Sequence, residues 1–408
     1  MNGRIFMSKI LEGVKVIDFT NGHFGSYATM IFSDFGADVI KIENITTGGD
    51  TIRTLAPKTE KGSAYHAYLN RGKKSMCLDF ASEQGRSIIL KLVADADVVC
   101  ESCPRGVMEK YGLGYEDLCK VNPKIIYASN TGFGKTGPMS DTAGSDLTAQ
   151  AVSGLMDITG HEGTLPTAHG SRMAGQFGNM YFAIAIIAAL LARDETGEGQ
   201  QIDVAANDCM ITALEVAFFS EKMNGIPYVK EGNASRAIAP YDTFSVKDGY
   251  VSTAVSTNAQ WEKFCDVMGF PEYIDDERLN TNEVRGENYK TLLVKIIDKK
   301  FQHMTRSEIE ELLRPLNIPS GSVLTVEEAF DSEQIKHRNM VIELEDKALG
   351  KLLMPGMPIK LSEFDDEPGS SAPLLGEHTR SILTELGYCD EEIKHLADQG
   401  IISEGSEL

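Results

Sequence analysis

Short apolar segments rich in β-branched residues alternate with helical patterns over the first 200 residues. Segments 14–19, 37–43, 96–101 and 124–129 have the length of buried strands, and stretches of helical character separate them. Strands that are apolar throughout and alternate with helices are typical of a parallel sheet covered on both faces. The pattern predicts a Rossmann-like α/β unit over residues 10 to about 205.

The pattern changes after about residue 225. Residues 240–255 alternate in polarity around Lys247-Asp248-Gly249, which predicts an antiparallel hairpin, and helical stretches follow it. We therefore expect a small α+β domain at 223–330. It would be inserted into a large α/β domain formed by 10–222 and 331–408.

The longest apolar run extends from Met180 to Ala192. It is shorter than the roughly 20 residues that span a bilayer, so we expect a buried core helix. The net charge of −21 disfavours nucleic acid and anionic membranes as partners. The seven cysteines are an odd number, the N-terminus lacks the apolar core of a secretory signal, and the eight histidines show no metal-binding spacing. We expect a cytoplasmic protein with free thiols and no metal site.

The segment 132–137, GFGKTG, has the G-x-G-x-x-G spacing of dinucleotide-binding loops and follows a predicted strand. Pro138 and polar residues come next, so no helix N-terminus is placed to receive a pyrophosphate. The preferred interpretation is a tight loop that lines a site. A nicotinamide or flavin role is the disfavoured alternative.

A cationic turn, Asn70-Arg71-Gly72-Lys73-Lys74, precedes the apolar segment MCLDF. On an acidic protein, a local group of cations suits a phosphate ligand. The alternative is a solvated surface loop.

Ten segments, taken in order over residues 10 to about 400, resemble the family III CoA-transferases, which include formyl-CoA transferase, carnitine CoA-transferase and 2-methylacyl-CoA racemase. The resemblance implies a Rossmann-like large domain made from both chain ends, a smaller inserted α+β domain and an interlocked dimer. It also places CoA near the carboxyl ends of the strands. The segments are LEGVKVIDFT, GADVIKIE, NRGKKS, GVMEKYGLGYEDL, NPKIIYASNTGFGKTGP, GSDLTAQAVSGLM, AALLARDETGEGQQIDV, DGYVSTAV, IPSGSV and PLLGEHTRSILTELGY.

The resemblance also implies a set of CoA contacts. In it, two residues after the first strand lie beside CoA, a turn receives the adenine, and Lys110 meets a phosphate. Roles that involve no ligand stay open as alternatives, because His23 could cap the following helix and Lys110 could be a solvated helix residue. The contacts are His23, Phe24, Leu69, Asn70, Arg71, Gly72, Lys73, Ser102, Lys110 and Lys135. The chain departs from the family pattern at Ser26, Asn44 and Ser102, where the family has proline, a basic residue and asparagine.

The family's reaction depends on one aspartate, whose carboxylate attacks the thioester carbonyl and later carries CoA as a thioester. The segment from Pro166 to Gln200 follows the family spacing without a gap and puts Gly175 at the aspartate's position. Glycine has no nucleophile. The amides Gln176 and Asn179 cannot replace it, and a displaced carboxylate such as Asp146 or Asp157 is the less favoured alternative.

Two main hypotheses follow for the reaction. In the first, the chain is one subunit of a heteromeric CoA-transferase, and a homologous chain supplies the aspartate. In the second, it is a catalytically silent CoA-binding or regulatory homologue. A racemase is less favoured, because that branch needs histidine at Ser145 and aspartate at Gly175. The expected ligands are an acyl-CoA thioester, as substrate with no further cofactor, and a small carboxylic acid, for which Arg236 is a candidate partner or only a surface residue.

Overall fold

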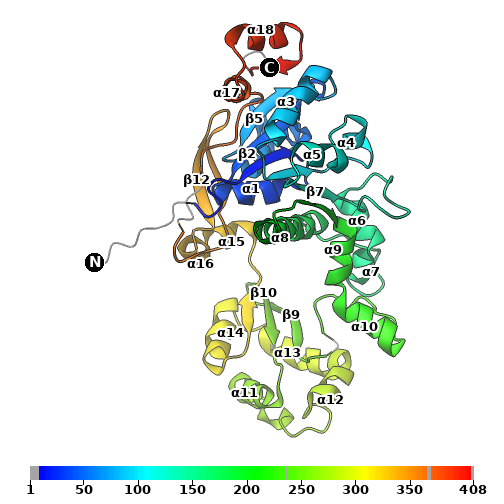
Figure 1. The fold of residues 1–408 in the computed structure, drawn as a ribbon. Helices are drawn as coiled ribbons and strands as arrows, with labels where there is room; N and C mark the ends of the chain where they lie inside the picture. The colour runs from blue at the N-terminus through cyan, green and yellow to red at the C-terminus, as the bar shows by residue number, and fades with distance from the viewer. Residues whose placement is uncertain (1–8, 236, 365–368, 406–408) are drawn as a thin grey trace. The chain divides into compact units, whose positions relative to one another are not determined.

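A computed structural model describes residues 9–235, 237–364 and 369–405; Arg236 lies outside the described residues. Its main sheet has seven strands in the order β14-β5-β2-β1-β6-β7-β8 (Figure 1). All neighbouring strands are parallel except β14, which is antiparallel to β5. The predicted parallel α/β sheet is confirmed. The strands are β1 (Lys15–Phe19), β2 (Asp38–Asn44), β5 (Lys74–Leu78), β6 (Val98–Glu101), β7 (Ile126–Thr131), β8 (Gln200–Ala205) and β14 (Ile402–Ser403).

Both faces of this sheet are buried, which explains the uninterrupted apolar strands. Successive residues of a strand point to opposite faces. On β1, Ile17 joins one core cluster with residues of α3 (Glu83–Val93). Val16 joins another with Phe32 of α1 (Ser26–Asp34) and Phe182 of α8 (Met173–Thr196).

Helix α8 (Met173–Thr196) is longer than the apolar run that predicts it, and it is not wholly buried. One face packs into the core through Phe182, Ile186 and Leu190. The other face is exposed, with Ile184 at 63% and Leu191 at 65%. The expectation of a buried core helix is therefore wrong for this face. By length and hydropathy α8 could cross a bilayer, but half of its apolar window is buried in the chain.

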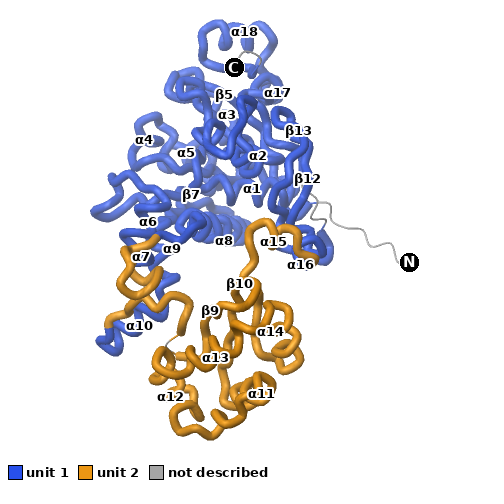
Figure 2. The backbone as a smooth tube through the Cα atoms, turned by 180° about the vertical axis from the view of Figure 1, so that it is seen from behind, with its two compact units in different colours: residues 1–156, 168–226, 334–408 blue, residues 157–167, 227–333 orange. Residues whose placement is uncertain are grey.

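The chain divides into two compact units, which Figure 2 shows in different colours. Unit 1 contains residues 1–156, 168–226 and 334–408, and unit 2 contains 157–167 and 227–333. The C-terminal segment belongs to unit 1 because β14 pairs with β5 and α17 (Thr379–Glu385) packs against it. The implied fold, a large α/β part made from both chain ends with an inserted smaller part, is confirmed.

Unit 2 has a three-stranded sheet in the order β11-β10-β9, in which β11 is Ser320–Ser322. Strands β9 (Tyr241–Val246) and β10 (Gly249–Ala254) form the predicted antiparallel hairpin, with Gly249 opposite Val246. Its core surrounds Trp261 and Phe264 of α11 (Asn258–Met268). Unit 2 is thus an α+β fold with its own core.

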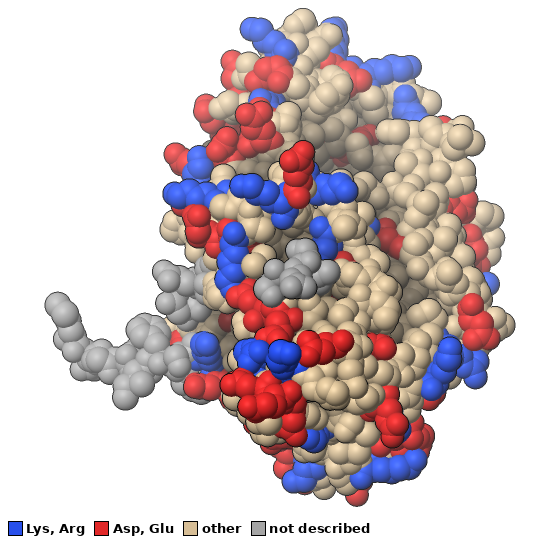
Figure 3. Space-filling model, turned by 90° about the horizontal axis from the view of Figure 1, so that it is seen from above, with Lys and Arg blue, Asp and Glu red and all other residues tan. Residues whose placement is uncertain are grey.

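The surface carries charges of both signs. Figure 3 shows acidic and basic side chains interspersed on the face that it draws. A net charge of −21 is therefore compatible with local groups of cations near a site.

Candidate active site

A cavity of about 250 Å³ lies at the carboxyl ends of strands β6 and β7 in unit 1. Phe24 lines it, together with residues 102–105, 131–134 and 140–144. In the wall of the cavity the backbone of Gly132 lies close to that of Gly144. A Cβ on Gly132 would be only 2.5 Å from the Gly144 Cα. Residues 132–134 of the loop therefore form part of the cavity wall, and the next helix is α6 (Asp146–Val152).

The structure brings Phe24 and Ser102 together at this cavity, and it adds Arg105, which sequence analysis missed. Arg105 donates a hydrogen bond to the Ser140 hydroxyl at 3.0 Å. Lys110, at the end of α4 (Val107–Lys110), is exposed and lies over the Tyr111 ring at 5.6 Å. Within the described residues neither cation has a carboxylate partner, so both remain available to an anionic ligand.

Lys135, unlike Arg105 and Lys110, has a carboxylate partner. Its Nζ lies 2.7 Å from Oε1 of Glu101 and donates to the Cys103 carbonyl. Burial raises the pKa of Glu101, and the ion pair with Lys135 opposes that shift. The charge of Lys135 is thus balanced within the chain.

The turn of Leu69 to Lys73 is buried, so its cations do not form an exposed phosphate-binding loop or a solvated one. Arg71 is 1% exposed and pairs with Asp34 at 2.6 Å. Lys73 is 2% exposed, pairs with Asp18 at 3.0 Å and donates to Asn70. Leu69 packs in a core cluster, and Gly72 donates its N–H to the Ser370 carbonyl. The adenine contact of this turn stays a prediction.

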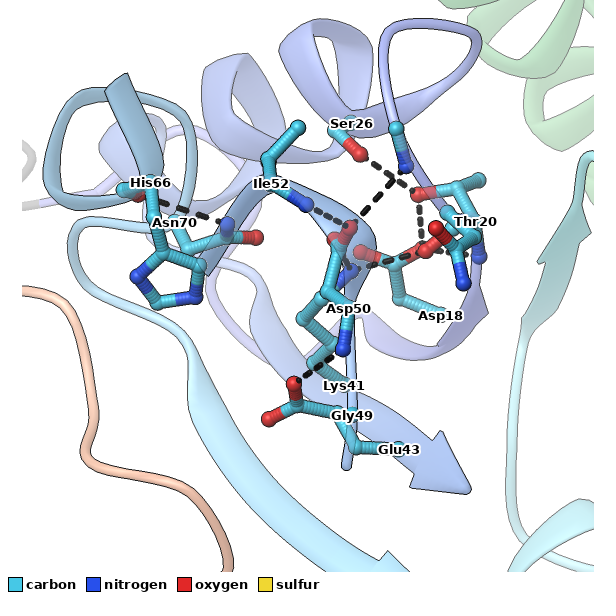
Figure 4. Close-up of polar contacts among 12 residues, drawn as sticks. Asp18, Thr20, Ser26, Lys41, Glu43, Gly49, Asp50, Ile52, His66 and Asn70 are labelled. Atoms are coloured by element: carbon cyan, nitrogen blue, oxygen red, sulfur yellow. Dashed lines mark hydrogen bonds and ion pairs between the residues drawn. The ribbon is translucent and has the colours of Figure 1, made fainter. Parts of the chain in front are cut away.

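Asp18 belongs to a buried network under the first strand–helix loop, and Figure 4 shows it with Lys41 and Asp50. Lys41 pairs with Asp50 at 2.7 Å and donates to the carbonyl of Thr20. Burial alone would raise the pKa of Asp18, but Lys73 and Lys41 lower it to about 2. Burial lowers the pKa of Lys73 to about 8 despite Asp18. The paired charges hold the loop that begins at Thr20.

The loop after β1 is fixed against α8 by Asn179. The Asn179 Oδ1 accepts the N–H of Gly25 at 2.6 Å, and its Nδ2 donates to the His23 carbonyl at 2.9 Å. Gly25 has φ of 89°, and a Cβ there would lie 2.3 Å from Thr20, so only glycine fits. His23 does not cap α1, whose N-cap is Gly25 without a side-chain hydrogen bond.

Gly175 lies in the first turn of α8, beside His23. Its N–H donates to Oδ1 of Asp146 at 2.8 Å, and Gln150 donates to Oδ2 of Asp146 at 2.7 Å. A Cβ on Gly175 would lie 3.6 Å from Asp146 and 3.9 Å from His23, at ordinary contact distances. The position has space for a side chain.

The side chains of His23, Tyr65 and Arg172 contact one another near Gly175. His23 Nδ1 lies 3.1 Å from the Tyr65 hydroxyl, and the Arg172 guanidinium contacts His23 Nε2. Burial, followed by the charge of Arg172, lowers the pKa of His23. Tyr65 and Arg172 are not among the site residues predicted from the sequence, although Arg172 is only three residues before Gly175.

The comparisons with known proteins agree with this architecture. Residues 11–379 match the model of CoA-transferase family III. The chain is 37% identical to human succinyl-CoA:glutarate CoA-transferase, over 97% of this chain and 90% of the relative. It is 35% identical to acetyl-CoA:oxalate CoA-transferase of Acetobacter aceti, over 92% and 95% of the two chains.

A solved structure gives the same result. The crystal structure of a CAIB/BAIF family protein from Brucella suis superposes with a TM-score of 0.82 at 37% identity and covers 93% of this chain and 100% of that chain. The match of the family model over most of the chain and relatives at this identity show the family. The chain belongs to CoA-transferase family III.

Proposed function

We propose that the chain transfers CoA between an acyl-CoA thioester and a small dicarboxylic acid, as one subunit of a heteromeric enzyme. The nucleophilic aspartate would come from a homologous chain. The observation that carries the proposal is Gly175 in the first turn of α8, in a site that otherwise retains a cavity at the strand ends. The substrate class is supported by relatives that are named for glutarate and oxalate transfer.

The reaction requires a carboxylate nucleophile. Its oxygen attacks the thioester carbonyl carbon, the C–S bond breaks, and CoA leaves as a thiolate with a mixed anhydride left behind. The thiolate then attacks the enzyme's own acyl carbon, the donor acid leaves, and the acceptor carboxylate takes CoA by the same two steps in reverse. Gly175 has no side-chain carboxylate to carry out these steps.

Asp146 is the nearest carboxylate in this chain, but its contacts favour a structural role. One oxygen caps the N-terminus of α8 through Gly175, and the other accepts from Gln150. Ser145 is likewise engaged as the N-cap of α6. These contacts support neither a displaced nucleophile nor the acid–base pair of a racemase.

The CoA end of the site retains cations. Arg105 lines the cavity at the strand ends, Lys110 is exposed at the end of α4, and such side chains suit the phosphates of CoA. Phe24 and Ser102 lie in the same cavity. We therefore place CoA there, with the thioester directed toward Gly175.

An exposed apolar surface in unit 1 supports assembly with a second chain. It lies on α8, α9 (Ala206–Ala213) and α10 (Glu215–Asn224). Exposed apolar side chains at this density are typical of interfaces between chains. The members are Met180, Tyr181, Ile184, Leu191, Ile211, Val216, Phe218, Phe219 and Met223.

Reconstitution tests the proposal. The chain is purified alone, and a homologous family III chain with aspartate at the position of Gly175 is purified separately. Succinyl-CoA:glutarate transfer is then measured for each chain and for the mixture at fixed concentrations. We expect transfer by the mixture that exceeds the sum of the two separate rates. Transfer by this chain alone would contradict the proposal, and a mixture no faster than the homologous chain by itself would favour a silent homologue.

A further inference from the structure

Asn179 lies in α8 about one turn beyond Gly175, and it is buried, with 2% of its surface exposed. Its Oδ1 accepts the N–H of Gly25 at 2.6 Å, and its Nδ2 donates to the carbonyl of His23 at 2.9 Å. These two residues are the chain neighbours of Phe24. One side-chain amide of α8 therefore holds the backbone on both sides of Phe24.

The amide of Asn179 is itself held in one orientation. Its oxygen must face an N–H group and its nitrogen a carbonyl, so a reversed amide would lose both bonds to the loop. Asn130, near the carboxyl end of β7, donates from Nδ2 to the same Oδ1 at 3.4 Å. Gly178 allows this approach, because a Cβ there would already lie 3.3 Å from Oδ1 of Asn130. Asn179 is thus a fixed link between α8 and the loop.

Phe24 connects this link to the cavity at the strand ends. Its side chain lines the cavity of about 250 Å³. It also packs against a small apolar cluster that includes Ala174 in the first turn of α8. A shift of the backbone at Phe24 would therefore change the cavity wall.

The first half of the same loop is held by other side chains. The N–H of Asn21 donates to Oγ of Ser102 at 2.9 Å, and the N–H of Gly22 donates to Oδ1 of Asp50 at 3.0 Å. Loss of the Asn179 amide would leave both of these bonds in place. Its effect should therefore be confined to the half of the loop that carries Phe24.

We propose that Asn179 is a positioning residue for CoA, which acts by holding Phe24 in the cavity wall in the place that CoA binding requires. Without the amide, the N–H of Gly25 and the carbonyl of His23 lose their partner, and unpaired backbone groups inside a protein are costly. The loop would then leave this conformation more often, and CoA would bind more weakly. This inference rests on the proposed placement of CoA in the cavity, and it assigns part of the CoA affinity to the helix that carries Gly175.

Calorimetric titration of the full chain with CoA at pH 7 tests the proposal. We expect saturable binding, which Asn179→Ala weakens by roughly 10-fold. Asn122→Ala is the matched control, because Nδ2 of Asn122 also donates to two backbone carbonyls, those of Val93 and Ala96 at 3.0 and 2.8 Å. Asn122 precedes β7 at the amino end of that strand, away from the cavity. Both variants should lower the urea midpoint, but Asn122→Ala should leave CoA affinity unchanged.

Asn179→Asp is a second variant for the case that Asn179→Ala does not fold. It keeps an acceptor for the N–H of Gly25 but turns a carboxylate oxygen toward the carbonyl of His23, so it should also weaken CoA binding. Far-ultraviolet circular dichroism confirms that each variant is folded.

A double-mutant cycle tests whether Asn179 acts through Phe24. Phe24→Ala should weaken CoA binding by itself. Adding Asn179→Ala to it should weaken binding little further, because the side chain that the amide positions is already gone. Fully additive effects would overturn the proposal. Unchanged CoA affinity in the folded Asn179 variants, or equal weakening by Asn122→Ala, would overturn it as well.

The titration separates this inference from the proposed function. CoA binding that Asn179→Ala leaves unchanged would overturn the inference alone. Absent binding of CoA to the unaltered chain would overturn the placement of CoA and this inference with it. Reconstitution with a homologous chain measures transfer, and its result is read independently of the Asn179 variants.

Discussion

The N–H of Gly175 donates a hydrogen bond to Oδ1 of Asp146 at 2.8 Å, so a side chain of α6 caps the first turn of α8. Gln150 holds the second oxygen of the same carboxylate. The contact places a negative charge at the positive end of the α8 dipole, where it is stabilising. The carboxylate closest to Gly175 thereby acts as a cap.

Asp146→Ala should lower the free energy of unfolding by about 1 kcal/mol, because it removes this cap. Asp194→Ala is the control, since Asp194 lies near the other end of α8 and its side chain is 73% exposed. Urea denaturation of both variants measures the difference. Equal stability of the two variants would mean that Asp146 does not cap α8.

Gly175→Asp should fold, because a Cβ at this position meets Asp146 and His23 only at 3.6 and 3.9 Å. It should also give the isolated chain a transfer rate roughly tenfold or more above that of Gly175→Asn, which has the same shape without a nucleophile. Succinyl-CoA:glutarate transfer of the two variants checks this. Equal rates would show that a carboxylate on this residue does not reach the thioester.

Lys73→Met should be strongly destabilising, by about 3–5 kcal/mol, because it leaves the carboxylate of Asp18 buried without its partner. Lys120→Met, a surface substitution, should change stability little. Urea midpoints at pH 7 compare the two. Similar midpoints would contradict the assignment of the Lys73–Asp18 pair.

The same pair predicts a pH dependence. The pKa of Asp18 is lowered from 3.8 to about 2 in the folded chain. A depressed carboxyl pKa contributes stability that is present above the unfolded value and lost as the pH falls toward the folded one. In the unaltered chain this contribution should therefore disappear between about pH 4 and pH 2, and Lys73→Met should lack most of it.

The pKa of His23 should rise toward its ordinary value of 6.5 when Arg172 becomes alanine, since the charge of Arg172 contributes to its lowering. Burial remains, so the rise should be partial. Because the folded pKa is depressed, the unaltered chain should lose stability as the pH falls below 6.5. NMR titration measures the pKa, with His378 as an internal control whose value should not move. An unchanged pKa of His23 in Arg172→Ala would contradict the contact between the two side chains.

The strands and the hairpin were predictable because their signals are local. Apolar β-branched runs mark β1 and β2, and Lys247-Asp248-Gly249 marks the turn of the hairpin. The exposed face of α8 was not predictable, because an apolar run does not show which of its residues pack inside the chain.

The candidate site was less predictable, because its contacts join residues far apart in sequence. The sequence places the cations Arg71 and Lys73 in one turn, but Asp34 and Asp18 neutralise them in the fold. Arg172 has no distinctive motif, and its contact with His23 forms only in the fold.

The most direct test of the central claim is to locate the covalent intermediate. The reconstituted enzyme is mixed with succinyl-CoA, quenched during turnover and treated with borohydride, and mass spectrometry then maps the reduced aspartyl thioester. We expect a modified aspartate on the homologous chain and none on this chain. A modified carboxylate on this chain, with Asp146 the first to inspect, would contradict it.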